Sequence, residues 1–401
     1  MGNSSTKNNY QNHQKYTSQY SLSDIIGGSC VGSSQSSHKE IKSWSRASCR
    51  SWSIGTLYDP LGTSKTIWPV SRSQAMFLPE FQIRQIPLHT AYTFLSVIAK
   101  GAYGKVYKIK KQDTGQFFAL KVISKAKVVG ENGVMQAKQE VSIQKLVGHY
   151  PFILDCSYRW QGRKTLYILT DYMSGGELFS LVKQCGPLPE NVVRIHVAEV
   201  ALAIDFLHNA GVVHRDIKAT NVLLDEEGHA VIIDFGLAKW LNHSERTNTL
   251  CGTPEYMAPE IFSKQHYGQE VDWWSLGVLA CFLLADQYPA GASCELFPED
   301  RGTDYAPVGT LPPNAENISA AAKDMLKRLL QPDPCLRLRS LLSLQRIAFY
   351  MGHDLRSYEQ KKESPFRLLG RKIETQQEKM IREFSNFESS LRDSISHAED
   401  R

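Results

Sequence analysis

Two carboxylates and an amide stand at a spacing that could support the transfer of a phosphoryl group. Asp216 and Asn221 are five residues apart in one segment, and Asp234 directly follows the apolar residues 231–233. Phosphoryl transfer to an alcohol requires a carboxylate at the hydroxyl, ligands for Mg²⁺ and cations at the phosphates. These three residues therefore form a candidate site for this chemistry.

A glycine-containing turn and a later lysine could supply the phosphate contacts. Gly101 and Gly104 lie between two β-type runs, and Lys121 lies in the middle of an apolar run further along. Glycines let backbone N–H groups approach phosphates closely, and a strand can hold a cation rigidly. A lysine in such a strand needs a partner, and Glu140 on the following predicted helix is the candidate. Taken singly, these residues also fit a hairpin turn, a solvent-facing lysine and a helix-surface carboxylate, but their order favours a phosphate site.

The elements that must position these residues separate into two parts of the chain. Strand patterns dominate residues 94–179, at 94–98, 105–109, 117–123 and 166–170, with one helical stretch at about 136–146. After Gly186 the pattern turns helical, as at residues 192–208, 273–284 and 319–330. We therefore predict an α+β fold in which a small strand-rich lobe precedes a larger helical lobe.

A set of short motifs resembles the signature of eukaryotic protein kinases. In chain order they are His214-Arg215-Asp216-Ile217-Lys218-Ala219-Thr220-Asn221, Asp234-Phe235-Gly236 and Ala258-Pro259-Glu260. The resemblance covers residues 94–350 and implies a bilobal protein-kinase fold, with a β-rich N-lobe and a helical C-lobe. It implies an enzyme that transfers the γ-phosphoryl group of ATP, with Mg²⁺, to hydroxyl groups of protein substrates. Lys218 points to serine and threonine as the acceptors.

The resemblance also implies a role for each matching residue. Asp216 would orient the substrate hydroxyl and accept its proton, and Lys218 would neutralise the γ-phosphate. Asn221 and Asp234 would hold Mg²⁺, and Lys121 would bind the α- and β-phosphates. The partner of that lysine and the other ATP contacts would be Glu140, Ala99, Lys100, Gly101, Ala102, Tyr103, Gly104, Val106, Ala119, Thr170, Asp171, Met173 and Glu177.

A longer segment is similar to the activation segment of the AGC group of kinases. It reads Thr249-Leu250-Cys251-Gly252-Thr253-Pro254-Glu255-Tyr256. In this register Thr249 would be a regulatory phosphosite, modified by an upstream activating kinase. A phosphate there would add nearly two negative charges, which Arg215 could bind to order the segment. An ordinary loop threonine is the alternative.

Two other segments resemble the ribosomal protein S-six kinase-related branch of this group. They are Phe77-Leu78-Pro79-Glu80-Phe81-Gln82-Ile83-Arg84, just before the kinase region, and Glu140-Val141-Ser142-Ile143-Gln144. The wider family pattern also implies that Asp272 holds the catalytic loop from a helix, and that Glu260 pairs with Arg337.

Several positions depart from the family pattern. Ala99 replaces the first glycine of the phosphate loop, and Ala219 and Thr220 replace a proline and a glutamate of the catalytic loop. Phe282 stands where some AGC kinases carry an acidic residue, so that only Glu177 remains of the acidic set that selects basic substrates. A strict preference for arginine-rich sites is therefore not expected. A catalytically weak scaffold with a kinase fold is the alternative function.

Composition limits the other function classes. The chain has 401 residues, a formal net charge of +5, 42% hydrophobic and 22% charged residues, which is ordinary for a globular protein. The charge is too mild to indicate nucleic-acid binding. The eight cysteines are scattered without a paired spacing, and no apolar run has the length of a membrane span. We therefore expect an intracellular, cytoplasmic protein with no nucleic-acid partner.

The two ends of the chain suggest further contacts. We divide the chain into a disordered Ser-rich tail at residues 1–75, a linker packing on the kinase domain at 76–93, the kinase domain at 94–350, and an AGC-like tail at 351–401. Gly2 lies in an N-myristoylation pattern, and one acyl chain would give weak membrane association. Phe384 and Phe387 resemble the AGC hydrophobic motif, which would fold back and steady the helix that bears Glu140, although a helical stripe for another groove is equally compatible.

Overall fold

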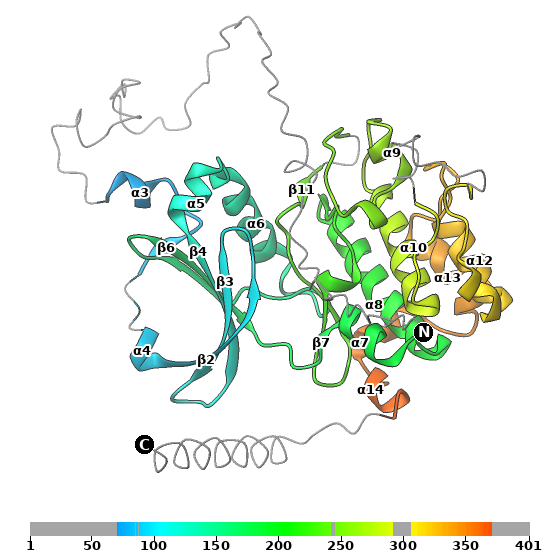
Figure 1. Ribbon diagram of the computed structural model, residues 1–401, viewed down its shortest axis with the longest axis horizontal. Helices are drawn as coiled ribbons and strands as arrows, with labels where there is room; N and C mark the ends of the chain where they lie inside the picture. Colours follow the sequence, from blue (N-terminus) through cyan, green and yellow to red (C-terminus); the bar gives the residue numbers. More distant parts are fainter. Residues whose placement is uncertain (1–69, 85, 87, 242–244, 292–305, 371–401) are drawn as a thin grey trace, which may run out of the picture.

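Six strands form the sheet of the small lobe, in the order β1-β5-β6-β4-β3-β2 (Figure 1). Neighbouring strands are antiparallel except β1 and β5, which are parallel. The computed structural model describes residues 70–84, 86, 88–241, 245–291 and 306–370. The strands are β1 (Gln82–Ile83), β2 (Tyr92–Lys100), β3 (Gly104–Lys111), β4 (Phe117–Ser124), β5 (Tyr158–Gln161) and β6 (Thr165–Asp171).

Short helices and one longer helix complete the small lobe. They are α3 (Arg72–Ala75), α4 (Leu88–Ala91), α5 (Lys125–Gly130) and α6 (Val134–Val147). Figure 1 shows α6 on the side of the sheet that faces the large lobe. Its buried residues Ala137 and Val141 share a hydrophobic cluster with Ile123 of β4 and Ile168 of β6. The helix predicted at 136–146 is thus present, with its ends extended by a few residues.

Helices build the large lobe, as the sequence predicts. They are α7 (Leu178–Cys185), α8 (Glu190–Asn209), α9 (Pro259–Phe262), α10 (Glu270–Ala285), α12 (Ala320–Leu329), α13 (Leu341–Gln345) and α14 (Pro365–Leu368). Every residue of α10 is buried, and α8 buries most of its length in the same cluster. Burial of apolar side chains around these two helices forms the main core of the protein.

Two small sheets lie among the helices of the large lobe. One has the order β10-β9-β7 and the other pairs β11 with β8. Their strands are β7 (Gly176–Glu177), β8 (Val212–Val213), β9 (Val222–Leu224), β10 (Ala230–Ile232) and β11 (Lys239–Trp240). The apolar run at residues 231–233 indicates a strand and overlaps β10, whereas the other strands, of two or three residues, are too short to show a period in the sequence. They are nevertheless important, because they fix both ends of the loop that carries Asp216.

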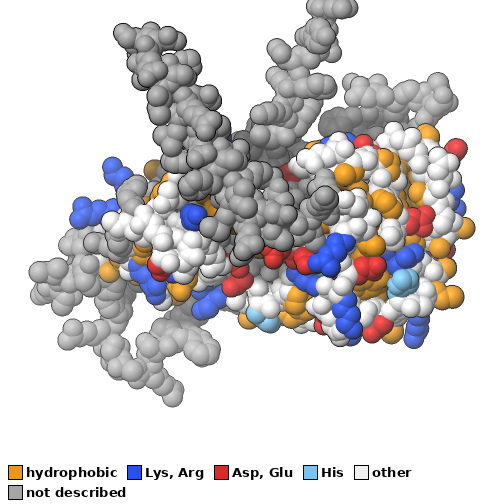
Figure 2. All heavy atoms as spheres, turned by 90° about the horizontal axis from the view of Figure 1, so that it is seen from below, with side chains coloured by type: hydrophobic (Ala, Val, Ile, Leu, Met, Phe, Trp, Pro, Cys, Tyr) orange, Lys and Arg blue, Asp and Glu red, His pale blue; other side chains and the backbone are white. Residues whose placement is uncertain are grey.

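Charged side chains of both signs are interspersed on the face shown in Figure 2. Within the part of the chain that the structure describes, each helix is too short or too polar to cross a lipid bilayer. Gly2, Phe384 and Phe387 lie outside the described residues, as do residues 1–69 and 371–401 of the two predicted tails. The predictions made for them therefore stay predictions.

Candidate active site

The phosphate loop is a hairpin between β2 and β3. The N–H of Gly101 donates to the carbonyl oxygen of Gly104 at 2.9 Å, which closes the turn around Ala102 and Tyr103. A Cβ atom at Gly104 would clash with the carbonyl oxygen of Val122, whereas a Cβ at Gly101 would meet open space. The second of these glycines is therefore required by packing, and the first keeps the outer side of the loop open for a ligand.

The strands behind the loop place five predicted nucleotide contacts on one face of the sheet. Val106 lies opposite Ala99 on one side and Lys121 on the other, and Ala119 lies opposite Thr170. Because side chains alternate along a strand, residues two apart and residues directly opposite share a face. The exposed Ala99 and Lys100 border the turn, while Thr170 is buried.

Tyr103 is positioned differently from its neighbours in the loop. Its ring packs against the cluster formed by α5, α6 and the sheet rather than standing free at the tip. A Cβ atom at Gly133 would meet the Tyr103 hydroxyl at 3.2 Å, so the ring also lies close to the start of α6. The phosphate loop is therefore connected by packing to the helix that carries Glu140.

An ion pair joins the sheet to α6. The Lys121 Nζ atom donates to Glu140 Oε1 at 2.6 Å. Burial alone would lower the pKa of Lys121, but the carboxylates of Glu140 and Asp234 raise it above its ordinary value. Lys121 is therefore held as a cation at the place where the sequence predicts contact with phosphates.

The catalytic loop brings Asp216, Lys218 and Asn221 together. Asp216 Oδ2 accepts from the Lys218 ammonium at 2.8 Å and from the Asn221 amide nitrogen at 2.9 Å. Thr253 donates its hydroxyl proton to Asp216 Oδ1 at 2.7 Å and accepts from Lys218 at 2.7 Å. The carboxylate is thus fixed by three partners, one of them from the activation segment.

Asp272 holds this loop from the first turn of α10. Its Oδ2 atom accepts from the backbone N–H of His214 at 2.9 Å and its Oδ1 from that of Arg215 at 2.8 Å. Burial alone would raise the pKa of Asp272, but the hydrogen bond with the His208 ring, 2.8 Å away, and other partners lower it. The fully buried carboxylate is therefore charged, and this lets Arg215 keep a left-handed φ of 66°.

Asp234 and Asn221 both offer oxygen atoms that could bind a metal ion. Asn221 uses its amide nitrogen in both of its bonds to Asp216, which leaves the amide oxygen as its ligand atom. Asp234 Oδ1 accepts from the N–H of Gly236 at 3.2 Å. Desolvation would raise the pKa of Asp234, but Lys121 and this N–H lower it. One carboxylate and one amide oxygen, with further positions open to phosphate oxygens, suit Mg²⁺.

The segment that follows β6 carries the residues that are predicted to contact adenine and ribose. Asp171 ends β6 and is paired with Phe118 of β4, and Met173 follows in a half-buried position. Glu177 is paired with Leu223 of β9, so its strand lies beside the end of the catalytic loop. Desolvation raises the pKa values of both Asp171 and Glu177.

Around Thr249 the structure shows contacts that sequence reasoning missed. The carbonyl oxygen of exposed Thr249 accepts from the Tyr267 hydroxyl at 2.6 Å, and that hydroxyl in turn accepts from Arg215 at 3.3 Å. Lys239 donates to the Thr247 hydroxyl at 2.9 Å, which lies 3.2 Å from the Thr249 hydroxyl. Arg215 and Lys239 are therefore each connected to Thr249 through one intervening residue, Tyr267 or Thr247. No local motif identifies Tyr267 or Lys239, because they meet Thr249 only in the folded chain.

Two glutamines of α6, also missed, bind the start of the activation segment. Gln136 donates to the carbonyl oxygen of Gly236 at 2.8 Å and Gln139 to that of Ala238 at 3.0 Å. Both carbonyls follow Asp234 closely in the chain. The orientation of α6 is therefore coupled to the segment that carries a predicted metal ligand.

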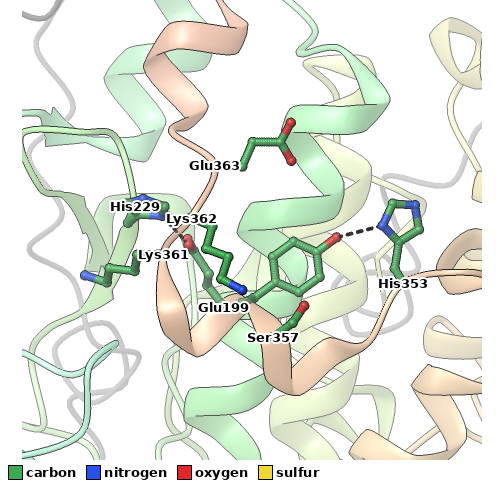
Figure 3. Close-up of a pocket in the computed structure, with 8 residues that line it drawn as sticks. Glu199, His229, His353, Ser357, Lys361, Lys362 and Glu363 are labelled. Atoms are coloured by element: carbon green, nitrogen blue, oxygen red, sulfur yellow. Dashed lines mark hydrogen bonds and ion pairs between the residues drawn. The ribbon is translucent and has the colours of Figure 1, made fainter.

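A pocket of about 140 Å³ lies on the large lobe (Figure 3). Its lining residues are Glu199, His229, His353, Ser357, Tyr358, Lys361, Lys362 and Glu363, and they include none of the predicted site residues. The C-terminal part of the described chain forms most of its wall. This part is anchored to the large lobe by Lys361, which pairs with Asp225 at 2.9 Å, and by Phe366, which packs over Gly228. The pocket therefore belongs to the packing of this segment rather than to the candidate active site.

Comparison with known proteins agrees with this geometry. The model of the protein kinase domain family matches residues 92–347, more than half of the chain. The chain therefore belongs to the protein kinase family, and the predicted family and bilobal α+β fold are confirmed.

Three relatives illustrate the similarity. A human ribosomal protein S6 kinase-related protein is 37% identical over 71% of this chain and 68% of the relative. A putative serine/threonine-protein kinase of Caenorhabditis elegans is 37% identical over 74% of this chain and 66% of the relative. A RAC family serine/threonine-protein kinase homolog of Dictyostelium discoideum is 36% identical over 68% of this chain and 61% of the relative. The predicted likeness to the S-six kinase-related branch is thus confirmed.

Proposed function

We propose that the chain transfers the γ-phosphoryl group of Mg-ATP to protein substrates, with Asp216 as the carboxylate at the reacting hydroxyl. The chain is a serine/threonine protein kinase by its family and relatives. The observation that carries the assignment of roles is the set of bonds from Lys218, Asn221 and Thr253 to the Asp216 carboxylate. Together these bonds hold the Asp216 carboxylate in one position.

Each residue contributes a separate part of the reaction. Asp216 orients the substrate hydroxyl and takes its proton as the new ester bond forms. Lys218, 2.8 Å from this carboxylate, neutralises charge on the transferred group. Lys121 holds the α- and β-phosphates, and Asn221 and Asp234 would hold Mg²⁺. The metal, when bound, supplies charge neutralisation at the phosphate oxygens.

The surroundings of Phe282 argue against a strict preference for basic substrates. Its fully buried ring stacks on Phe179 at 5.5 Å and on Tyr288 at 5.1 Å between ring centroids. The cation of Lys183 lies 5.1 Å from the centre of the same ring. A buried ring that already has a lysine over it offers a substrate arginine neither a negative charge nor a free face, so we infer that substrate selection relies on other residues.

Phosphorylation of Thr249 by an upstream kinase is proposed as the activating step. Its support is the position of Arg215 and Lys239, each one hydrogen-bonded residue away from Thr249. A phosphate has nearly two negative charges and three acceptor oxygens, enough to bind both cations. Acylation of Gly2 and weak membrane association stay predictions.

The test is phosphate transfer by the purified full-length chain. The chain is incubated with labelled Mg-ATP and peptide libraries whose central residue is serine, threonine or tyrosine. We expect label on serine and threonine peptides and almost none with an Asp216→Asn control. Incorporation no higher than in that control, after phosphorylation of Thr249, would refute the assignment. In that case the chain is a scaffold with a kinase fold.

A further inference from the structure

A short segment before the kinase region fills a groove on the small lobe. This N-terminal segment (residues 71–84) comprises α3, the turn that follows it and β1. Phe77 and Phe81 have no exposed surface, and their rings meet edge to face with centroids 6.3 Å apart. Within these 14 residues the chain thus buries two phenylalanines that its own short helix cannot cover.

The groove is formed by α5, α6 and the sheet. Phe77 and Phe81 share their cluster with Val128 of α5 and with Ala137 and Val141 of α6. Other members are Ile123, Cys156, Leu166 and Ile168, with Tyr103 of the phosphate loop packed against them. The two rings therefore touch the cluster that contains α6 and borders the phosphate loop.

Polar contacts fix the same segment around the groove. Gln161 donates to the carbonyl oxygens of Gln74 at 3.0 Å and Phe81 at 2.6 Å. The Lys125 ammonium donates to the carbonyl oxygen of Ser73 at 3.1 Å and lies 5.2 Å from the centre of the Phe77 ring. Gln161 and Lys125 are themselves buried. Without the segment the buried Gln161 amide nitrogen would lose both of these acceptors and the Lys125 ammonium would lose one of its three, which is costly.

Lys138 gives the N-terminal segment a direct polar contact with α6. Its ammonium pairs with the Glu80 carboxylate at 2.9 Å and donates to the carbonyl oxygen of Leu78 at 2.6 Å. Lys138 and Val141 stand on either side of Glu140 in the sequence of the same helix. A rotation or displacement of α6 that breaks the Lys121–Glu140 pair must therefore also disturb the contacts of the N-terminal segment.

We propose that the N-terminal segment is a built-in positioning element, which holds α6 where Glu140 reaches Lys121. This rests on the proposed kinase function of the same site. Phe77, Phe81 and Glu80 are positioning residues and act on ATP only through α6. The role that the sequence resemblance gives to Phe384 and Phe387, steadying this helix, is filled here by residues that precede the kinase region.

The first experiment removes the two rings from the full-length chain. In Phe77→Ala/Phe81→Ala we expect kcat to fall about tenfold or more, and the amides of α6 to exchange faster with solvent. A synthetic peptide of residues 70–84, added in trans, should restore most of the lost kcat and the slow exchange of α6. Ile109→Ala is the matched control, because it removes a fully buried side chain from the separate cluster of Phe118 and Trp160. The peptide should leave its kcat unchanged.

The second experiment tests whether the segment positions α6, and it uses substitutions that remove no buried apolar side chain. Glu80→Lys and Lys138→Glu each place like charges together, and we expect each to lower kcat about five- to tenfold. The double variant restores opposite charges and should return to within about twofold of the wild type. Lys111→Glu, at an exposed ion pair with Asp113 in the same lobe, is the control for charge reversal and should have little effect.

The outcomes separate the positioning role from the proposed function. Unchanged kcat in Phe77→Ala/Phe81→Ala, no effect of the peptide, or a charge-swapped double variant no better than the singles would overturn the positioning role. So would a strong loss of kcat in Phe384→Ala/Phe387→Ala together with none in the Phe77 and Phe81 variant. A wild-type chain without activity overturns the proposed function instead, and the exchange of α6 in the same variants then still tests the positioning role.

Discussion

The Lys121 ammonium in β4 and the Glu140 carboxylate in α6 lie 2.6 Å apart, so a charged hydrogen bond joins the sheet of the small lobe to this helix. Glu140 is mostly buried, with 15% of its side chain exposed. A buried carboxylate without its cation would pay a large desolvation cost. The Lys121–Glu140 pair therefore forms only when α6 is correctly positioned against the sheet.

The first prediction concerns this pair. Lys121→Met should lower kcat about 10²–10³-fold, because the phosphates lose a fixed cation. Glu140→Gln should have a smaller effect, since the lysine remains but is no longer oriented. Steady-state phosphorylation of a serine peptide measures both, with Lys111→Met as the matched control. Wild-type kcat in Lys121→Met would contradict the assigned role.

A second prediction concerns Thr253, which bonds both Asp216 and Lys218 at 2.7 Å. Thr253→Ala removes a hydrogen bond to a charged carboxylate, and we expect kcat to fall about tenfold. Thr253→Ser keeps the hydroxyl and should stay within about threefold of the wild type. The two substitutions are compared at saturating ATP. Equal losses would mean that the methyl group, and not the hydroxyl, is what matters.

The third prediction tests Thr249 as a switch. Phosphatase treatment of the active enzyme should lower kcat, and Thr249→Ala should have the low kcat before and after treatment, because Arg215 and Lys239 then lack an anion. Lys239→Gln should weaken the response to phosphorylation without abolishing it. The readout is the ratio of kcat values before and after treatment. A Thr249→Ala chain that responds like the wild type would place the regulatory phosphate elsewhere.

The fourth prediction is about stability. Arg337 donates to both carboxylate oxygens of Glu260, at 2.6 and 2.9 Å, and both side chains are almost fully buried. Arg337→Met leaves the carboxylate buried without its partner and should lower the free energy of unfolding by about 3–5 kcal/mol. Arg328→Met, which breaks an exposed pair with Asp324, should change it by less than about 1 kcal/mol. Chemical denaturation measures both, and equal losses would show that burial is not the cause.

Much of the site could be predicted from the sequence because its residues lie in short continuous motifs. Asp216, Lys218 and Asn221 are close in the chain, and the turn that follows fixes their side chains together. The long helices were also predictable, since α8 and α10 bury long stretches of apolar residues. Their ends were less clear. The helix α10 begins at Glu270, before the predicted start at residue 273, and so includes the charged Asp272. The carboxylate of Asp272 can be buried there because His208 and the catalytic loop donate hydrogen bonds to it.

Contacts between distant segments could not be predicted in the same way. Tyr267 meets Thr249 and Arg215 only after three separate parts of the chain have packed together. The partners of Phe77 and Phe81 were also hidden, although residues 76–93 were expected to pack on the kinase domain, because a short apolar stretch does not indicate which distant elements it contacts. Their partners lie on α5, α6 and β6, which the sequence places far downstream.

The last prediction concerns pH. His196 in α8 is fully buried; its Nε2 atom faces the carbonyl oxygen of Gly228 at 3.0 Å, while Nδ1 has no hydrogen-bond partner among the described residues. Burial lowers the pKa of His196 to about 4 from its ordinary 6.5. Between these values the unfolded chain binds a proton that the folded chain does not, so stability falls as the pH falls from 6.5 to 4, by about 3 kcal/mol in total. His196→Gln keeps an N–H donor but cannot titrate, so its stability should fall less over this range. Denaturation curves of both chains at pH 7, 6, 5 and 4 test this, and parallel losses would assign the acid sensitivity to other groups.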